Sequence, residues 1–133
     1  LARAVRADKM ALAALQSVAL AYLAGDGDAI PLWRMAATPL AALRARAEAL
    51  AAQVPGAKVV DTEAVAGGGS LPGLGIPSVG VAIECRDPDV TATRLRTHDV
   101  VARVDDGCIV CDLRTVAPAD DAALAAALHA ACA

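Results

Sequence analysis

Two arginines near the start of the chain, Arg3 and Arg6, have a type and spacing that suit an anion site. They lie three positions apart in a stretch without a regular hydrophobic period, so we expect an irregular segment rather than a helix face. Two guanidinium groups in such a segment can converge on one phosphate through bidentate, charge-assisted hydrogen bonds. On spacing alone, two surface arginines are the commoner interpretation.

A glycine-rich stretch is a second candidate anion site, because successive glycines let backbone N–H groups approach a ligand closely. It contains Gly67, Gly68, Gly69 and Ser70, followed by Leu-Pro-Gly. The Gly-Lys-Ser/Thr of a P-loop does not follow, and a predicted strand comes next where a dinucleotide fingerprint needs a helix. An ordinary hairpin loop is the competing interpretation.

Arg114 is a third candidate, because it follows the second strand of a predicted hairpin. An arginine at a strand end beside a glycine-rich loop is a suitable ligand for a carboxylate or a phosphate. A salt bridge at the rim of the domain, for example with Asp112, is an equally good interpretation.

The side chains that catalysis needs do not form a recognisable set. The two lysines are Lys9 and Lys58, and neither has the apolar or cationic neighbours that would lower a lysine pKa. No Ser-His-Asp or paired-carboxylate arrangement can be argued from the spacing. We therefore expect no catalytic residue in this chain.

The four cysteines include a C-x-x-C pair, Cys108 and Cys111, which taken alone would suggest zinc or redox chemistry. Both lie in an alternating run from Val100 to Leu113 that predicts a strand, where residues three apart point to opposite faces. We therefore expect apolar structural thiols, no metal site and a reducing, cytoplasmic compartment.

The composition is that of one compact domain of 133 residues, 57% hydrophobic but only 2% aromatic, so the core must come from Ala, Leu and Val. The net charge of −3 does not favour nucleic-acid binding by the body of the chain. No apolar run approaches the roughly 20 residues of a membrane span. Because the first residue is Leu1 rather than Met and no signal peptide follows, we expect a piece of a longer cytosolic protein.

Helical patterns dominate the first part of the chain. Asp8 is a good N-cap for a helix from Lys9 to Ala24, and Ile30 begins a short connector. Thr38 is expected to cap a second helix with Pro39 in its first position. An apolar stripe predicts the buried face of that helix: Leu40, Leu43, Ala47, Leu50 and Val54.

After this helix the hydrophobic period becomes that of strands. The predicted strands are residues 57–65, 77–85, 100–104 and 108–113, and the predicted helices are residues 88–98 and 118–131. Asp105-Asp106-Gly107 is a strong hairpin signal. The order predicts a two-layer α/β (α+β) domain at residues 38–133, with a mostly antiparallel sheet and helices on one face. Residues 1–37 form a linker segment and a long helix before it.

These features occur together and in order in one enzyme family. The segments that carry the resemblance are residues 3–15, 30–31, 67–72, 103–107 and 112–116. Over essentially the whole chain they resemble the bacterial selenocysteine synthases, the L-seryl-tRNA(Sec) selenium transferases. The resemblance implies a fold-type-I pyridoxal-phosphate transferase of selenocysteine biosynthesis, which converts seryl-tRNA(Sec) to selenocysteinyl-tRNA(Sec) with selenophosphate.

The resemblance also places this chain at the C-terminal end of such an enzyme, where a linker helix leaves the large domain and the small domain follows. The lysine that binds pyridoxal 5′-phosphate would lie upstream of Leu1, so the piece would be inactive alone. Enzymes of this family form homo-oligomers built from dimers, with a decamer as one option. Partly exposed apolar residues on the linker helix, such as Leu12, Leu15 and Tyr22, are then expected in the isolated chain.

Site residues follow from the resemblance position by position. Arg3 and Arg6 match the family's arginine pair for the phosphate of selenophosphate, which favours a function for them. The stretch from Gly67 to Ser70 matches a family signature at the rim of the same site. Arg114 matches a carboxylate-binding arginine of related fold-type-I enzymes, but here the substrate's carboxylate is esterified to tRNA, which leaves that role open.

Two other classes of protein stay compatible with the residues alone. One is a stand-alone two-layer α/β module that binds a ligand or a partner, with the glycine loop as its pocket. The other is a pyridoxal-phosphate paralogue that acts on another substrate.

Overall fold

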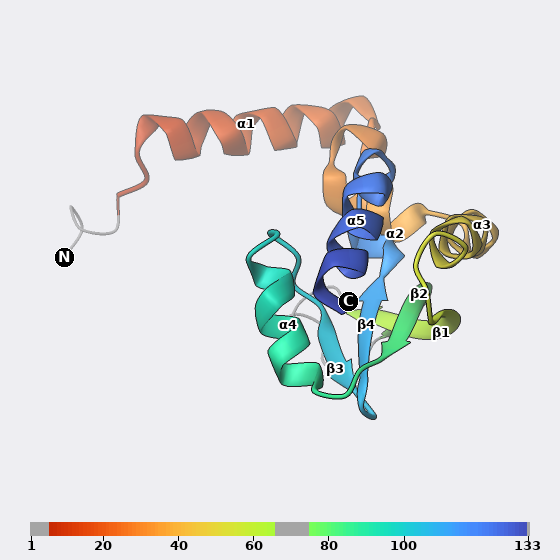
Figure 1. The fold of residues 1–133 in the computed structure, drawn as a ribbon. Helices are drawn as coiled ribbons and strands as arrows, with labels where there is room; N and C mark the ends of the chain where they lie inside the picture. The colour runs from red at the N-terminus through yellow and green to blue at the C-terminus, as the bar shows by residue number, and fades with distance from the viewer. Residues whose placement is uncertain (1–5, 66–74, 133) are drawn as a thin grey trace. The chain divides into compact units, whose positions relative to one another are not determined.

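The computed structural model describes residues 6–65 and 75–132. The chain consists of two compact units, Leu1–Ala37 and Thr38–Ala133. Figure 1 shows the ribbon, and each unit is described by itself. Within the described ranges, no helix combines the length and the apolar character that crossing a membrane requires.

The first unit is built around helix α1 (Lys9–Ala24). Its predicted cap is confirmed, since the Asp8 side chain accepts a hydrogen bond of 2.8 Å from the Ala11 N–H. Gly25 ends the helix in the left-handed conformation, with φ of 71°, which a residue without Cβ adopts at little cost. The helix exposes its apolar residues as expected, with Leu12 53%, Leu15 65% and Tyr22 58% exposed.

The predicted connector after α1 is helical instead. A 3₁₀ turn, η1 (Gly27–Ala29), leads into helix α2 (Pro31–Ala37). Proline suits the first position of a helix because its φ is already helical and its missing N–H is not needed there. Trp33 in α2 donates a hydrogen bond of 2.5 Å to the Tyr22 hydroxyl, which ties the two helices of this unit together.

The second unit begins with helix α3 (Leu40–Ala51), and the predicted cap at Thr38 is wrong. Pro39 is the N-cap, and it makes no side-chain hydrogen bond to the first turn because proline has no side-chain acceptor. The predicted stripe is largely confirmed, since Leu43, Ala47, Leu50 and Val54 are buried. Leu40 is the exception and is 46% exposed at the helix start.

The sheet has four antiparallel strands in the order β1-β2-β4-β3 (Figure 1). Their bounds are β1 Ala57–Val65, β2 Gly75–Glu84, β3 Arg103–Asp105 and β4 Cys108–Asp112. The predicted hairpin turn is confirmed, because Asp106 and Gly107 both have positive φ, 45° and 75°.

Strand β3 is shorter than predicted. Val100 donates its N–H to the Leu95 carbonyl at the end of helix α4 (Pro88–Arg96), so it is not available for a strand ladder. Asp99, with φ of 59°, turns the chain at this point. The start of α4 agrees with the prediction, since Asp87 caps it by accepting from the Val90 N–H at 3.0 Å.

Two 3₁₀ turns, η2 (Leu113–Thr115) and η3 (Pro118–Asp120), connect β4 to the last helix, α5 (Asp121–Cys132). One core joins the sheet to helices α3, α4 and α5. From the sheet it takes Val79, Val81, Ile83, Ile109 and Cys111, and from the helices Leu43, Leu50, Leu95, Leu124 and Leu128. Because the β2 members of this core alternate along the strand, they share one face. The predicted two-layer α/β fold is therefore confirmed.

Candidate functional site

Arg114 lies in η2, directly after β4, and is only 5% exposed. Asp112, the partner suggested for it from the sequence, accepts a hydrogen bond of 2.9 Å from the Arg114 backbone N–H. The same carboxylate oxygen accepts from the Ser78 hydroxyl at 2.5 Å. Asp112 therefore fixes the backbone of this turn and links it to β2.

The guanidinium of Arg114 donates to main-chain carbonyls from two other parts of the second unit. One terminal nitrogen lies 2.9 Å from the Thr38 carbonyl oxygen, and the other lies 2.6 Å from the Pro77 carbonyl oxygen. A buried guanidinium requires such acceptors, since burial without them is costly. Through these two hydrogen bonds, Arg114 connects the start of the second unit and the first part of β2 to the turn after β4.

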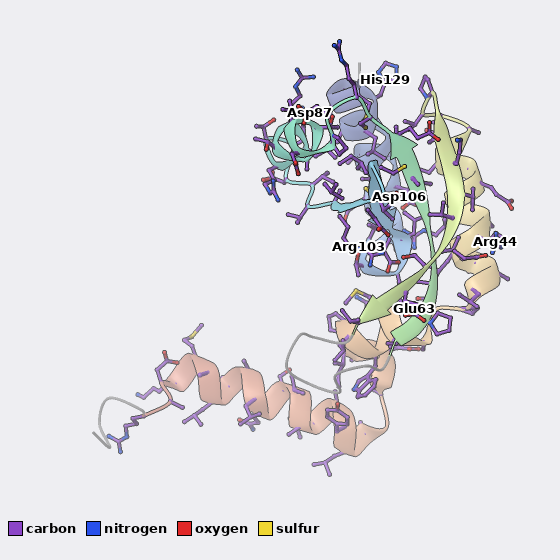
Figure 2. The ribbon with its side chains drawn as sticks, turned by 90° about the horizontal axis from the view of Figure 1, so that it is seen from below. Arg44, Glu63, Asp87, Arg103, Asp106 and His129 are labelled. Atoms are coloured by element: carbon purple, nitrogen blue, oxygen red, sulfur yellow. The ribbon has the colours of Figure 1, made fainter. Side chains whose placement is uncertain are left out.

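A surface hollow of about 520 Å³ lies beside Pro77. It is lined by Leu40, Asp61, Thr62, Glu63, Pro77 and Ser78. Ion pairing and hydrogen bonding order its charged rim. Arg44 lies 2.5 Å from Asp61, and Arg103 reaches from β3 to the Thr62 hydroxyl and to the Glu63 carbonyl (Figure 2).

The predicted glycine loop connects β1 to β2 in the sequence, next to strand residues that line this hollow. Gly67, Gly68, Gly69 and Ser70 themselves lie outside the described residues. Gly75, the first residue of β2, lies close to the Glu63 side chain. A Cβ on Gly75 would lie 2.6 Å from a Glu63 carboxylate oxygen. Glycine at this position therefore leaves room for the Glu63 side chain.

The predicted arginine pair belongs to the first unit. Arg3 lies outside the described residues. Arg6 is exposed and is separated by one residue from Asp8, the cap of α1. Arg6 therefore lies two positions before the residue that caps the start of α1.

Pyridoxal phosphate needs an amine that can lose its proton, and the surroundings of Lys58 oppose this loss. Lys58 forms an exposed ion pair with Glu84, with 2.6 Å between nitrogen and oxygen. The hydrogen bond to Glu84 and the charge of that carboxylate raise the pKa of Lys58, so it stays an ammonium group. Lys9 is exposed in the first turn of α1.

The C-x-x-C cysteines diverge as predicted. Cys111 is paired with Val81 in the sheet and lies in the core, whereas Cys108 is paired with Glu84 and is only partly buried. Over the described ranges, no group of three or more His, Cys, Asp or Glu side chains could hold a metal ion.

Sequence analysis missed one structural arginine, Arg46 in α3. It forms a two-point ion pair with Asp121 at the start of α5, with nitrogen–oxygen distances of 2.9 and 2.6 Å. It also donates to the carbonyls of Leu113 and Val116, at the start of η2 and just after its end. The partners are 75 positions apart in the sequence, so no local pattern could have indicated this contact.

A family model for L-seryl-tRNA selenium transferase matches residues 1–117 of the chain. Three curated proteins named L-seryl-tRNA(Sec) selenium transferase are similar to it. The protein from Moorella thermoacetica is 37% identical over 141 aligned residues, that from Wolinella succinogenes 35% over 121, and that from Caldanaerobacter subterraneus 33% over 139.

These alignments cover 96%, 87% and 97% of this chain, in the same order, but only 30%, 27% and 30% of the relatives. The chain thus spans less than a third of the length of the curated relatives that it matches. The family match extends over both units and includes all the site residues proposed from the sequence. The chain belongs to the L-seryl-tRNA selenium transferase family.

Proposed function

We propose that this chain is the C-terminal part of a transferase that converts seryl-tRNA(Sec) to selenocysteinyl-tRNA(Sec) with selenophosphate. The family match over residues 1–117 is the observation that carries this proposal. The names of the similar proteins support the same activity, since each is called an L-seryl-tRNA(Sec) selenium transferase.

In this proposal Arg3 and Arg6 bind the phosphate group of selenophosphate. Guanidinium groups bind phosphate oxygens through two parallel hydrogen bonds, which orients the group as well as attracting it. Arg6 is exposed and close to the capped start of α1, which supports its use by an external anion. A donor held in one orientation next to its acceptor reacts with a lower entropic cost than a free one.

Gly67 to Ser70 would form part of the rim of the same active site, as the family signature implies. The hollow beside the neighbouring strands supports a surface role for this loop. Direct contact between Arg114 and a substrate carboxylate stays a prediction. Its bonds to the Thr38 and Pro77 carbonyls support a role in holding the start of the second unit and the strand that follows the loop.

Pyridoxal 5′-phosphate would be bound by a lysine of the whole protein outside this chain, as the resemblance implies; the ion pair of Lys58 with Glu84 and the exposed position of Lys9 support this. Homo-oligomers built from dimers are part of the same proposal. The apolar residues that α1 exposes, Leu15 at 65% and Leu23 at 85%, support the burial of this helix against another part of the whole protein. A cytoplasmic location is part of the same proposal, because the proposed substrate is a tRNA.

The direct test uses the full-length, cofactor-loaded protein with seryl-tRNA(Sec) and selenophosphate that carries a radioactive label on its selenium atom. We expect label in the aminoacyl group of the tRNA, and none when seryl-tRNA(Ser) replaces the substrate. A folded and cofactor-loaded protein that transfers no selenium would overturn the proposal and favour a paralogue acting on another substrate.

A further inference from the structure

Two cysteines that are distant in the sequence meet at one edge of the second unit. Cys85 follows the last residue of β2, and Cys132 is the last residue of α5. Their sulfur atoms lie 4.0 Å apart, although 47 positions separate them in the chain. Neither residue belongs to the site that the family resemblance assigns.

Both thiols are accessible to a small molecule. Cys85 and Cys132 are each partly exposed, and both line a surface hollow of about 360 Å³ together with Arg86 and Arg94. Glu84 and Asp87 line it too, so the charges of the hollow balance and neither an anion nor a cation is excluded.

The other two cysteines do not line this hollow. Cys111 is 6% exposed within the core, and Cys108, although partly buried like Cys85 and Cys132, lies on the opposite face of β4 from Cys111. The shared hollow therefore contains one thiol pair, and its members are Cys85 and Cys132.

We propose that Cys85 and Cys132 form a reversible disulfide when the protein meets a small-molecule disulfide. A disulfide has a sulfur–sulfur distance of about 2.05 Å, so the two sulfurs must approach by about 2 Å. Side-chain rotation can supply this movement, because Cys132 ends its helix and Cys85 lies just beyond its strand. The bond would join the end of β2 to the end of α5.

The chemistry balances as two successive thiol–disulfide exchanges. The Cys85 thiolate attacks one sulfur of the small disulfide, forms a mixed disulfide and releases one thiolate. The Cys132 thiolate then attacks the Cys85 sulfur of the mixed disulfide and releases the second thiolate. The protein dithiol loses two electrons and two protons, and the small disulfide is reduced to two thiols.

The order of attack follows from the surroundings of Cys132. Burial, with a smaller effect of the neighbouring Cys85, raises the pKa of Cys132 to about 11. Cys132 therefore forms a thiolate less readily than an ordinary cysteine, and we place it in the second step, where proximity to the mixed disulfide assists it.

Tryptic peptide mapping distinguishes the thiols cleanly. Peptide 59–86 carries Cys85, peptide 104–114 carries Cys108 and Cys111, and the peptide that begins at Thr115 carries Cys132. After incubation of the whole protein with oxidised glutathione, we expect a cross-linked species of the first and third peptides. The number of free thiols per chain should fall by two and recover with dithiothreitol.

Two substitutions and one matched control complete the test. Cys85→Ser and Cys132→Ser should each abolish the cross-link, whereas Cys108→Ser should leave it unchanged. A cross-link within or to peptide 104–114 in the native protein, or no loss of thiols after prolonged oxidation, would overturn the proposal. The thiol count does not depend on selenium transfer, so this test and that of the proposed activity fail independently.

Discussion

At the scale of single residues, the buried guanidinium of Arg114 stabilises the second unit through its hydrogen bonds to two main-chain carbonyls. Arg114→Met would remove the two hydrogen bonds that the buried guanidinium donates to the Thr38 and Pro77 carbonyls. We expect the free energy of unfolding to fall by about 2–4 kcal/mol, since a hydrogen bond from a charged group contributes about 1.5–3 kcal/mol and water can partly replace the donors at these carbonyls. Denaturant unfolding followed by circular dichroism measures the change.

Arg44→Met is the matched control for this substitution. Arg44 pairs with Asp61 at the surface, where the two side chains are 47% and 79% exposed. Exposed ion pairs contribute at most about 1 kcal/mol, so this variant should stay close to the parent protein. Equal stability of the Met variants at positions 114 and 44 would contradict the role of Arg114 as an anchor.

Cys111 should make stability depend on alkaline pH. Burial, with a smaller effect of Cys132, raises the pKa of the Cys111 thiol to about 11, against 9.0 for an ordinary cysteine. Below pH 9 both states keep the proton, so the stabilising contribution is fully present. Between pH 9 and pH 11 the unfolded chain releases a proton that the folded chain retains, and the free energy of unfolding falls as pH rises.

The loss attributable to Cys111 is on the order of 1–3 kcal/mol across that window. Urea midpoints measured between pH 8.5 and pH 11 would report it, with Cys111→Ala as the comparison. The other alkaline groups are common to both proteins, so the difference between the two pH profiles isolates this thiol. Identical profiles would show that Cys111 does not retain its proton in the folded chain.

At the scale of elements, the pairing of β2 with β4 depends on Gly80. A Cβ at this position would lie 2.2 Å from the Cys111 carbonyl oxygen, a main-chain atom that moves only with its strand. Gly80→Ala should therefore lower the free energy of unfolding by about 1–3 kcal/mol or more, as overpacking does. Thermal unfolding measures it.

Gly27→Ala provides the control for Gly80→Ala. No heavy atom lies within 4 Å of a Cβ built on Gly27, and this glycine has no positive φ. Its replacement should change the unfolding midpoint little. If the alanine variants at positions 27 and 80 unfold at the same temperature, the close approach of the strands at Gly80 is not a constraint.

The elements that sequence analysis located correctly are those with local signals. Asp8 and Asp87 cap their helices through bonds to residues three positions ahead, and the Asp106-Gly107 turn needs only its own conformation. Two predicted element starts were wrong. Val100 gives its N–H to the Leu95 carbonyl at the end of α4, so β3 begins later than predicted. Helix α3 begins one residue later than predicted, and the Thr38 carbonyl accepts from Arg114, 76 positions away. A partner at that distance leaves no periodic trace in the sequence.

The candidate site could be anticipated only in part. The residue types of the Arg3–Arg6 pair, the glycine loop and Arg114 drew attention to them, but spacing alone left ordinary surface roles open. The resemblance and the family match over residues 1–117 supplied the activity that these residues could serve. The hydrogen bonds from the buried Arg114 to two distant carbonyls were not predictable. They depend on how the start of the second unit, β2 and the turn after β4 pack together.

At the scale of the whole molecule, the chain contributes only part of the protein that it belongs to, since it spans less than a third of its curated relatives. Helix α1 carries apolar residues that the isolated chain leaves exposed, such as Met10 at 80% and Leu23 at 85%. We expect the whole protein to bury this helix and thereby hold Arg6 in place.

The most direct test of this account is the selenophosphate dependence of selenium transfer by the full-length protein with Arg6→Ala. Arg96→Ala, an exposed arginine of α4, is the matched control. We predict that kcat/KM for selenophosphate falls at least about tenfold in the first variant, since a charge-assisted hydrogen bond contributes about 1.5–3 kcal/mol. The control should match the parent protein. An Arg6→Ala enzyme with the parent's kcat/KM for selenophosphate would contradict the assignment of the donor site to this chain.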